Sequence, residues 1–125
     1  MIKHILNFKR PSGTSRGVLT SKETFFLVIE QEGKKGTGEC NLFRGLSADD
    51  VPDYEAKLQW VEQHLHLGEK ALLEELKTFP SIQFGVEQAF RSVVAPQWYE
   101  LFPSNFTKGK DAIPINGLIW MGSPD

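Results

Sequence analysis

The sequence has a single cysteine, no long apolar run and no excess of positive charge, and each shortage excludes a class of protein. One cysteine, Cys40, cannot form a disulfide within the chain, so a secreted fold held by disulfides is excluded and a reducing compartment fits best. No stretch reaches the roughly 18 apolar residues of a transmembrane helix. The N-terminus also lacks the apolar core of a signal peptide. We therefore expect a soluble, cytoplasmic protein.

The sequence also lacks a large net charge of either sign. Fourteen Lys and Arg residues stand against sixteen Asp and Glu residues, which gives a formal net charge of −2. Binding to a phosphate backbone needs a positive field, so nucleic acid is not an expected partner. Neither 13–17 nor 33–36 has the glycine spacing of a P-loop or a dinucleotide-binding turn. Nucleotide hydrolysis therefore loses its main support.

Metal ligands and nucleophiles are few, and their spacing does not suit catalysis. His64 and His66 lie two residues apart on a predicted helix, so their side chains should point to different sides. No second histidine recurs at the i, i+4 spacing of a helical metal site. Cys40 would need a base and an orienting group beside it, so a buried structural thiol is the simpler interpretation. We assign no catalytic residue and no metal ligand to this chain.

The first third of the sequence predicts three strands. A first strand covers 2–8, and the Ser-, Thr- and Gly-rich stretch 11–22 that follows is predicted to be a mobile loop. The run 24–30 is aromatic and β-branched on both faces, which is typical of a strand covered on both sides. Turn residues at 32–35 then allow 36–40 to return as an antiparallel third strand.

The middle of the sequence predicts helices, and strands followed by helices indicate an α+β fold. Helical periodicity begins near residue 50, and an apolar stripe runs along 54–65. A shorter helix is predicted over 69–77, and a third begins with Ser81 as its N-cap and ends at Pro96. Gly85 lies inside this third helix, where a close helix contact would explain it. An acidic cluster is predicted to cap the first helix: Asp49, Asp50 and Asp53.

The last residues predict a strand without a partner. The apolar run 113–122 is typical of a buried parallel strand, which needs neighbours on both sides. A parallel partner requires a crossover of about a dozen residues or more, and the sequence stops at Asp125. We therefore expect a fragment of a larger protein, in which 113–121 is exposed or drives self-association.

Two loops carry the residues best suited to bind a small molecule. The stretch 15–19 combines an arginine, a glycine and apolar side chains, and 41–47 repeats this combination after the third strand. Arginine pairs with planar carboxylates through two hydrogen bonds, and Leu and Phe can cover an apolar ring. Together the loops predict one side of a pocket for an anionic small molecule. The alternative that both are ordinary connections stays open.

Three segments resemble a known family when they are taken together. The stretches 38–47, 80–89 and 113–117 have the order and spacing of the N-terminal capping domain of the enolase superfamily, and most closely of its o-succinylbenzoate synthase family. The first resembles the Gly-Glu-x-x-Pro-Leu-Pro-Gly-x-Ser loop, although Leu42 and Arg44 stand where that pattern has prolines. The match covers nearly the whole chain.

This resemblance implies both a fold and a binding site. It implies an α+β capping domain over 1–110, with a three-stranded antiparallel meander followed by a helical bundle. Residues 111–125 would then begin a truncated TIM barrel, whose active site lies at its C-terminal mouth. The two loops would close over the substrate there. The implied substrate-binding residues are Arg16, Gly17, Leu19, Phe43, Gly45, Leu46 and Asn116.

The implied reaction is the Mg²⁺-dependent dehydration of 2-succinyl-6-hydroxy-2,4-cyclohexadiene-1-carboxylate to o-succinylbenzoate, a step of menaquinone biosynthesis. Metal ligands and base lysines would come from later barrel strands, so the chain alone should be inactive and its own barrel domain should be its partner. Dipeptide epimerases and N-succinylamino acid racemases have similar caps and are the first alternative. A stand-alone small-molecule-binding or interaction module is the second.

Overall fold

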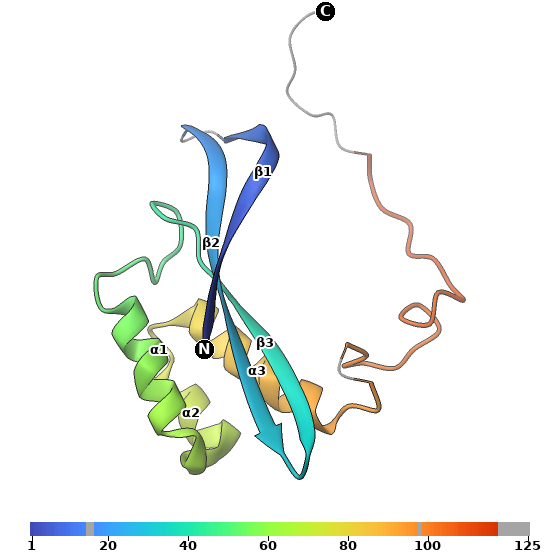
Figure 1. Cartoon of the computed structure of the whole chain (residues 1–125). Helices are drawn as coiled ribbons and strands as arrows, with labels where there is room; N and C mark the ends of the chain where they lie inside the picture. Colours follow the sequence, from blue (N-terminus) through green and yellow to red (C-terminus); the bar gives the residue numbers. More distant parts are fainter. Residues whose placement is uncertain (15–16, 98, 118–125) are drawn as a thin grey trace, which may run out of the picture.

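The structure is a computed structural model of the 125-residue chain, and it describes residues 1–14, 17–97 and 99–117. A three-stranded antiparallel sheet of order β1-β2-β3 comes first and helices follow, as predicted for an α+β fold (Figure 1). In these residues no helix has the length and apolar character needed to cross a membrane. The elements are β1 (Ile2–Thr14), β2 (Gly17–Gln31), β3 (Lys34–Asn41), α1 (Tyr54–Gln63), the 3₁₀ turn η1 (Leu65–Leu67), α2 (Gly68–Glu75) and α3 (Pro80–Val94).

The predicted mobile loop at 11–22 is not a loop in its described residues, which extend a long β-hairpin. Ser12 pairs with Leu19, and the register between β1 and β2 is irregular between Asn7 and Ser12. Pro11 lies inside this irregular stretch of an edge strand, where its missing N–H breaks no ladder. The polar composition of 11–22 gave no signal for a strand. This end of the β1–β2 hairpin, the hairpin arm, projects beyond the helices and is largely exposed to solvent (Figure 1).

The helices cover one face of the sheet. Phe25, Leu27 and Ile29 of β2 are buried against them. On the opposite face Val28 is 42% exposed and Phe26 is half-buried. The prediction of a strand covered on both sides is therefore wrong for the described chain, because side chains alternate between two faces and only one of them meets helices.

The main core lies between the covered face of the sheet and the three helices. The predicted stripe of α1 is confirmed, since Tyr54, Leu58 and Val61 are buried. Leu42, just after β3, is also fully buried. Burial of one such side chain stabilises a fold by about 1.5–3 kcal/mol. The buried cluster consists of Phe25, Leu27, Cys40, Leu42, Tyr54, Leu58, Val61, Leu72, Leu76, Ile82 and Val86.

Glycines let α3 lie directly against β3. A Cβ atom on Gly38 would stand 1.7 Å from the carbonyl oxygen of Gly85, and one on Gly85 would stand 2.4 Å from Cys40 Sγ. The helix contact expected at Gly85 is therefore confirmed. At this distance α3 also satisfies the free edge of β3, because the Glu39 N–H donates to Gln88 Oε1 over 2.9 Å.

The aspartates do not cap α1 as predicted. Asp53 precedes α1, but its side chain makes no capping hydrogen bond. Asp49 is buried, and its Oδ2 accepts hydrogen bonds from the Ser81 N–H at 2.8 Å and the Ser81 hydroxyl at 2.6 Å. It therefore satisfies the first turn of α3, whose N-cap residue is Phe79 rather than Ser81. The tertiary fold brings this carboxylate to a helix far along the chain.

The described part of the predicted barrel strand does not form a strand. Residues 113–117 have no regular secondary structure, and Ile113 and Ile115 are 58% and 88% exposed. A strand takes its backbone hydrogen bonds from a neighbour, and none of the described strands pairs with this stretch. The remainder of the predicted strand, 118–122, lies outside the described residues. The domain division near residue 110 stays a prediction.

Candidate functional site

The described part of the first predicted binding loop, which lies on β2, meets the second predicted loop in the structure. Leu19 from the hairpin arm faces Phe43 and Leu46 from the loop between β3 and α1, and the three side chains line one open hollow of about 440 Å³. Its lining is mostly apolar, which suits a ring or a hydrocarbon chain better than a strongly hydrated group. The remaining lining residues are Phe8, Ser12 and Ser47.

A second hollow of about 270 Å³ adjoins the first and has a different character. Leu19 and Phe43 line both, so these side chains form the wall that the hollows share. The second hollow adds charged side chains, namely Lys22, Glu23 and Arg44. An apolar surface therefore lies next to a charged one, as in a site for a molecule with an apolar body and an ionised end.

The other predicted binding residues that the structure describes are not among those that line the two hollows. Gly17 begins β2 with a φ of 136°, and Gly45 turns the loop with a φ of 74°. Both values lie in the region that favours glycine. Asn116 is exposed in the C-terminal segment and lines neither hollow. Arg16 lies outside the described residues. Substrate binding by all seven residues stays a prediction.

Arg44 fixes the loop rather than presenting a free cation. Its Nε and Nη2 donate to Glu23 Oε2 over 3.0 and 2.8 Å, and its Nη1 donates to Asp50 Oδ1 over 2.8 Å. Asp50 Oδ2 accepts the Gly45 N–H at 2.6 Å. The Gly45 N–H and the Arg44 guanidinium hold the pKa of Asp50 below its usual value. Protein carboxylates therefore already engage the guanidinium of Arg44, and binding of an anionic ligand by this arginine stays a prediction.

Further hydrogen bonds close the loop on itself and join it to the core. The Phe43 N–H donates to Ser47 Oγ, and the Ser47 N–H donates to the Phe43 carbonyl, both over 2.9 Å. Below the loop, the Tyr54 hydroxyl lies 2.7 Å from Ser81 Oγ, which also donates to Asp49. Burial raises the pKa of Tyr54. Polar contacts thus hold the loop that lines both hollows and the residues next to it in the chain.

Lys22, on β2, is nearly buried beside Phe43. Its side chain is 9% exposed, its Nζ lies 3.4 Å from Glu39 Oε1, and the same Nζ lies 5.0 Å from the centre of the Phe43 ring. Glu39 Oε1 also accepts the Thr24 hydroxyl at 2.7 Å. The sequence analysis missed Lys22, because a lysine in a polar stretch usually reads as a solvated side chain.

Cys40 has the structural role that its sequence context favours. It is fully buried in the core, and burial raises the pKa of its thiol to about 12, with smaller contributions from Asp49 and Glu39. The thiolate is the nucleophilic and metal-binding form, so a thiol with this pKa is inert at neutral pH.

The histidines depart from the prediction in one respect. The rings of His64 and His66 lie 5.8 Å apart instead of on different sides of a helix, because α1 ends at Gln63 and His66 lies in η1. His64 stacks on Trp60, and its Nδ1 lies 2.7 Å from the Trp60 carbonyl oxygen. Across the described ranges, no group of three or more His, Cys, Asp or Glu side chains comes together to hold a metal ion.

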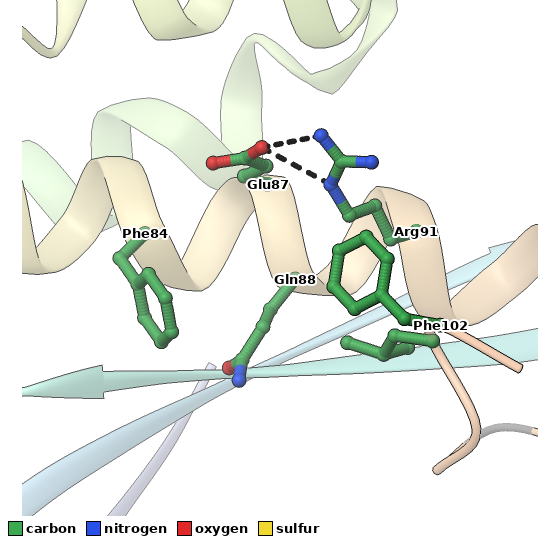
Figure 2. A pocket seen from close by; sticks show the side chains of 6 residues that line it. Phe84, Glu87, Gln88, Arg91 and Phe102 are labelled. Atoms are coloured by element: carbon green, nitrogen blue, oxygen red, sulfur yellow. Dashed lines mark hydrogen bonds and ion pairs between the residues drawn. The ribbon is translucent and has the colours of Figure 1, made fainter. Parts of the chain in front are cut away.

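The structure also has a hollow that the sequence analysis did not identify. It measures about 130 Å³ and lies where residues 101–102 meet α3 (Figure 2). Arg91 donates twice to Glu87 Oε1, over 3.0 and 2.6 Å, and its guanidinium lies 5.3 Å from the centre of the Phe102 ring. Phe84, which falls outside the buried stripe of α3, is a sequence signal for this surface.

Comparison with known proteins shows what this chain is similar to. No family model matches the chain. A curated relative from Desulfotalea psychrophila is 34% identical over 94% of this chain, and its name is o-succinylbenzoate synthase. The chain is similar to o-succinylbenzoate synthase. It spans about 40% of the length of that relative.

A solved structure supports the same similarity at the level of the fold. A crystal structure of MenC from Desulfotalea psychrophila superposes on 98% of this chain with a TM-score of 0.74 and 27% sequence identity. The chain covers 41% of that structure, so it has the length of a part of o-succinylbenzoate synthase. The α+β fold and the resemblance stated from the sequence are confirmed, and both fit an N-terminal part.

Proposed function

We propose that this chain is the N-terminal capping part of an o-succinylbenzoate synthase-like lyase. The full-length enzyme would eliminate water from 2-succinyl-6-hydroxy-2,4-cyclohexadiene-1-carboxylate to give o-succinylbenzoate in cytoplasmic menaquinone biosynthesis. The similarity to o-succinylbenzoate synthase over 94% of the chain is the observation that carries this proposal. The meeting of the two predicted loops in one hollow supports it, because the loops were implied by the same resemblance.

The chain would contribute substrate selection and exclusion of water. Leu19, Phe43 and Leu46 present an apolar wall that can lie against a six-membered ring. Covering the ring in this way removes solvent from the reacting part of the substrate and orients it for the chemistry. Proton transfer is not assigned to any residue of this chain. The cross-links of Arg44 support a wall that is already in place before the substrate binds.

A further domain would cover apolar surface that the chain leaves open. Ile113 and Ile115 are exposed, and so are Leu6 and Val28 on the open face of the sheet. A stand-alone module should instead place 113–121 in a polar or paired setting, so the exposed isoleucines favour the proposal over that alternative. The barrel domain of the same protein is the proposed occupant.

Mg²⁺ belongs to the proposed reaction, but the described residues of this chain do not fit it. When bound, the ion stabilises negative charge that develops on the substrate in enzymes of this superfamily. The carboxylates near the loops are already engaged, since Asp49 accepts from Ser81 and Asp50 from Arg44 and Gly45. We therefore propose that the barrel domain supplies all the metal ligands.

Turnover by the full-length protein tests the proposal. The full-length protein and the 125-residue chain are incubated with the cyclohexadiene carboxylate and Mg²⁺, and the loss of its ultraviolet absorbance is followed. We expect turnover by the full-length protein alone, abolished by EDTA and restored by Mg²⁺. A full-length protein that epimerises dipeptides or racemises N-succinylamino acids but leaves the cyclohexadiene unchanged would contradict the synthase and favour the alternative caps.

A further inference from the structure

The proposed substrate is anionic, so a cationic side chain is expected to bind it. The structure leaves few candidates for this cation. Two cations line the two hollows among the described residues, namely Lys22 and Arg44. Arg44 already gives three hydrogen bonds to Glu23 and Asp50 at 2.8–3.0 Å. A guanidinium held from two sides in this way is a structural cross-link, and its release would loosen the loop. Lys22 is therefore the better candidate to contact a ligand.

The position of Lys22 suits contact with a ligand that lies on the shared wall. Its ammonium group lies 5.0 Å from the centre of the Phe43 ring, and Phe43 lines both hollows. The side chain is 9% exposed, so its methylene stem is held in place by its surroundings. A buried ammonium interacts more strongly with an anion than a solvated one does, because less water screens the charge.

The present partner of Lys22 leaves room for a second one. The Lys22–Glu39 distance of 3.4 Å is longer than the usual 2.7–3.2 Å of an N–H···O hydrogen bond. Glu39 Oε1 takes its short bond from the Thr24 hydroxyl, at 2.7 Å. An ammonium group has three N–H donors. A ligand carboxylate can therefore bind to Lys22 without breaking a short hydrogen bond of the protein.

We propose that Lys22 binds a carboxylate of the substrate while Leu19 and Phe43 cover its apolar part. This inference rests on the proposed function and names the residue that recognises the anionic end of the substrate. Lys22 would determine specificity through affinity, so its loss should weaken binding more than it slows the chemical step.

The test uses the full-length enzyme with three substitutions of Lys22. Lys22→Met removes the charge and keeps the stem, Lys22→Gln keeps a polar donor, and Lys22→Arg keeps the charge. Lys35→Met removes a lysine that is 71% exposed beside the β2–β3 turn and serves as the matched control. KM and kcat are measured, together with the Kd of o-succinylbenzoate and of its two monoamides.

We expect Lys22→Met and Lys22→Gln to raise KM and the Kd of o-succinylbenzoate about ten- to hundredfold, the loss typical of a charge-assisted hydrogen bond. For one monoamide, Kd should be the same in wild type, Lys22→Met and Lys22→Gln, which identifies the carboxylate that Lys22 contacts. Lys22→Arg should restore most of the affinity, and Lys35→Met should match wild type. If Lys22→Met does not fold, Lys22→Gln gives the same comparison.

Failure of this inference can be told apart from failure of the proposed function. Wild-type turnover together with unchanged KM and Kd in the Lys22 variants overturns the role of Lys22 and leaves the synthase intact. Equal losses for o-succinylbenzoate and both monoamides also overturn it, because they show a general disturbance of the wall. A wild-type protein that neither turns over the substrate nor binds o-succinylbenzoate overturns both.

Discussion

At the scale of single residues, Arg44 joins three parts of the chain around the hollows. It links the loop that carries Phe43 to Glu23 on β2 and to Asp50 ahead of α1. The superfamily pattern has a proline here, which would fix the backbone by its ring. In this chain the side chain of Arg44 restrains the loop instead, through hydrogen bonds to carboxylates on two sides.

Arg44→Ala should therefore loosen the wall of the hollow more than it destabilises the fold. The side chain is 46% exposed, so we expect a loss of at most about 1 kcal/mol in the free energy of unfolding. The freed loop should raise KM of the full-length enzyme several-fold. Urea denaturation and steady-state kinetics measure the two effects, with Arg91→Ala as a control for a similarly exposed ion pair on α3. Unchanged KM beside an intact fold would contradict this role.

The same cross-link predicts a dependence of stability on pH. The Arg44 guanidinium lowers the pKa of Glu23, and the Gly45 N–H and Arg44 lower that of Asp50. A carboxylate with a depressed folded-state pKa adds stability above its unfolded pKa, near 4, and that stability is lost as the pH falls through the folded pKa. The difference in urea midpoint between wild type and Arg44→Ala should thus be constant from pH 7 to about 5 and shrink below pH 4. A difference that grows on acidification would contradict the assignment.

Asp49 is the buried counterpart of this surface cross-link. Its carboxylate accepts two hydrogen bonds from Ser81 and is buried. Asp49→Ala would leave both Ser81 donors to find other partners, which should cost about 1–3 kcal/mol of unfolding free energy. Asp49→Asn retains an acceptor and should recover part of this loss. Denaturation of both variants provides the measurement, and equal stability of the two would show that the acceptor is dispensable.

At the level of elements, the contact between α3 and β3 depends on the absence of side-chain atoms. A Cβ on Gly38 would meet backbone atoms of Gly85, which cannot move aside as a flexible side chain would. We expect Gly38→Ala to destabilise the protein by about 1–3 kcal/mol, as overpacking of a core does. Gly117→Ala is the matched control, because a Cβ there meets nothing within 4 Å. Thermal denaturation compares the two, and similar melting temperatures would contradict the close packing.

The elements also show what the sequence can predict and where it fails. Hydrophobic periodicity predicts the strand around Phe25 and the stripe of α1, because local spacing decides which face is buried. Composition does not predict the hairpin arm, since a solvated strand pair such as Gly13 and Val18 carries no apolar alternation. Asp49 was recognised as a helix cap but given to the wrong helix, because capping across the fold depends on packing that no local pattern contains.

Some residues of the candidate site were predicted from the sequence and others were not. Leu19, Phe43 and Leu46 were predicted from two loops of similar composition, and the structure brings them into one hollow. Lys22 was missed, because its burial arises only when a distant loop folds its Phe43 ring over it. The sequence therefore identifies segments whose composition differs from that of their neighbours. It does not identify a lysine such as Lys22, whose burial and position at the hollow depend on tertiary contacts.

For the whole molecule, the open face of the sheet and the C-terminal segment leave apolar surface without cover in the described part of the chain. Ile115 is 88% exposed and Val28 is 42% exposed. Burying one such side chain contributes about 1.5–3 kcal/mol, so contact with a second protein surface is favourable. In the 125-residue chain that surface can come from another copy, whereas in the full-length protein the barrel domain would supply it.

Self-association of the 125-residue chain should therefore depend on concentration and on this surface. Sedimentation velocity should show a rising weight-average sedimentation coefficient as the chain is concentrated. Ile115→Lys should shift the association to at least about tenfold higher concentration, because it removes the gain from burying one apolar side chain and adds charge. Leu67→Lys, at a 44% exposed position in η1, is the matched control and should leave the association unchanged. A chain that stays monomeric throughout, or one equally affected by both substitutions, would mean that 113–117 is not the contact surface, and the barrel domain would then have to cover other parts of the cap.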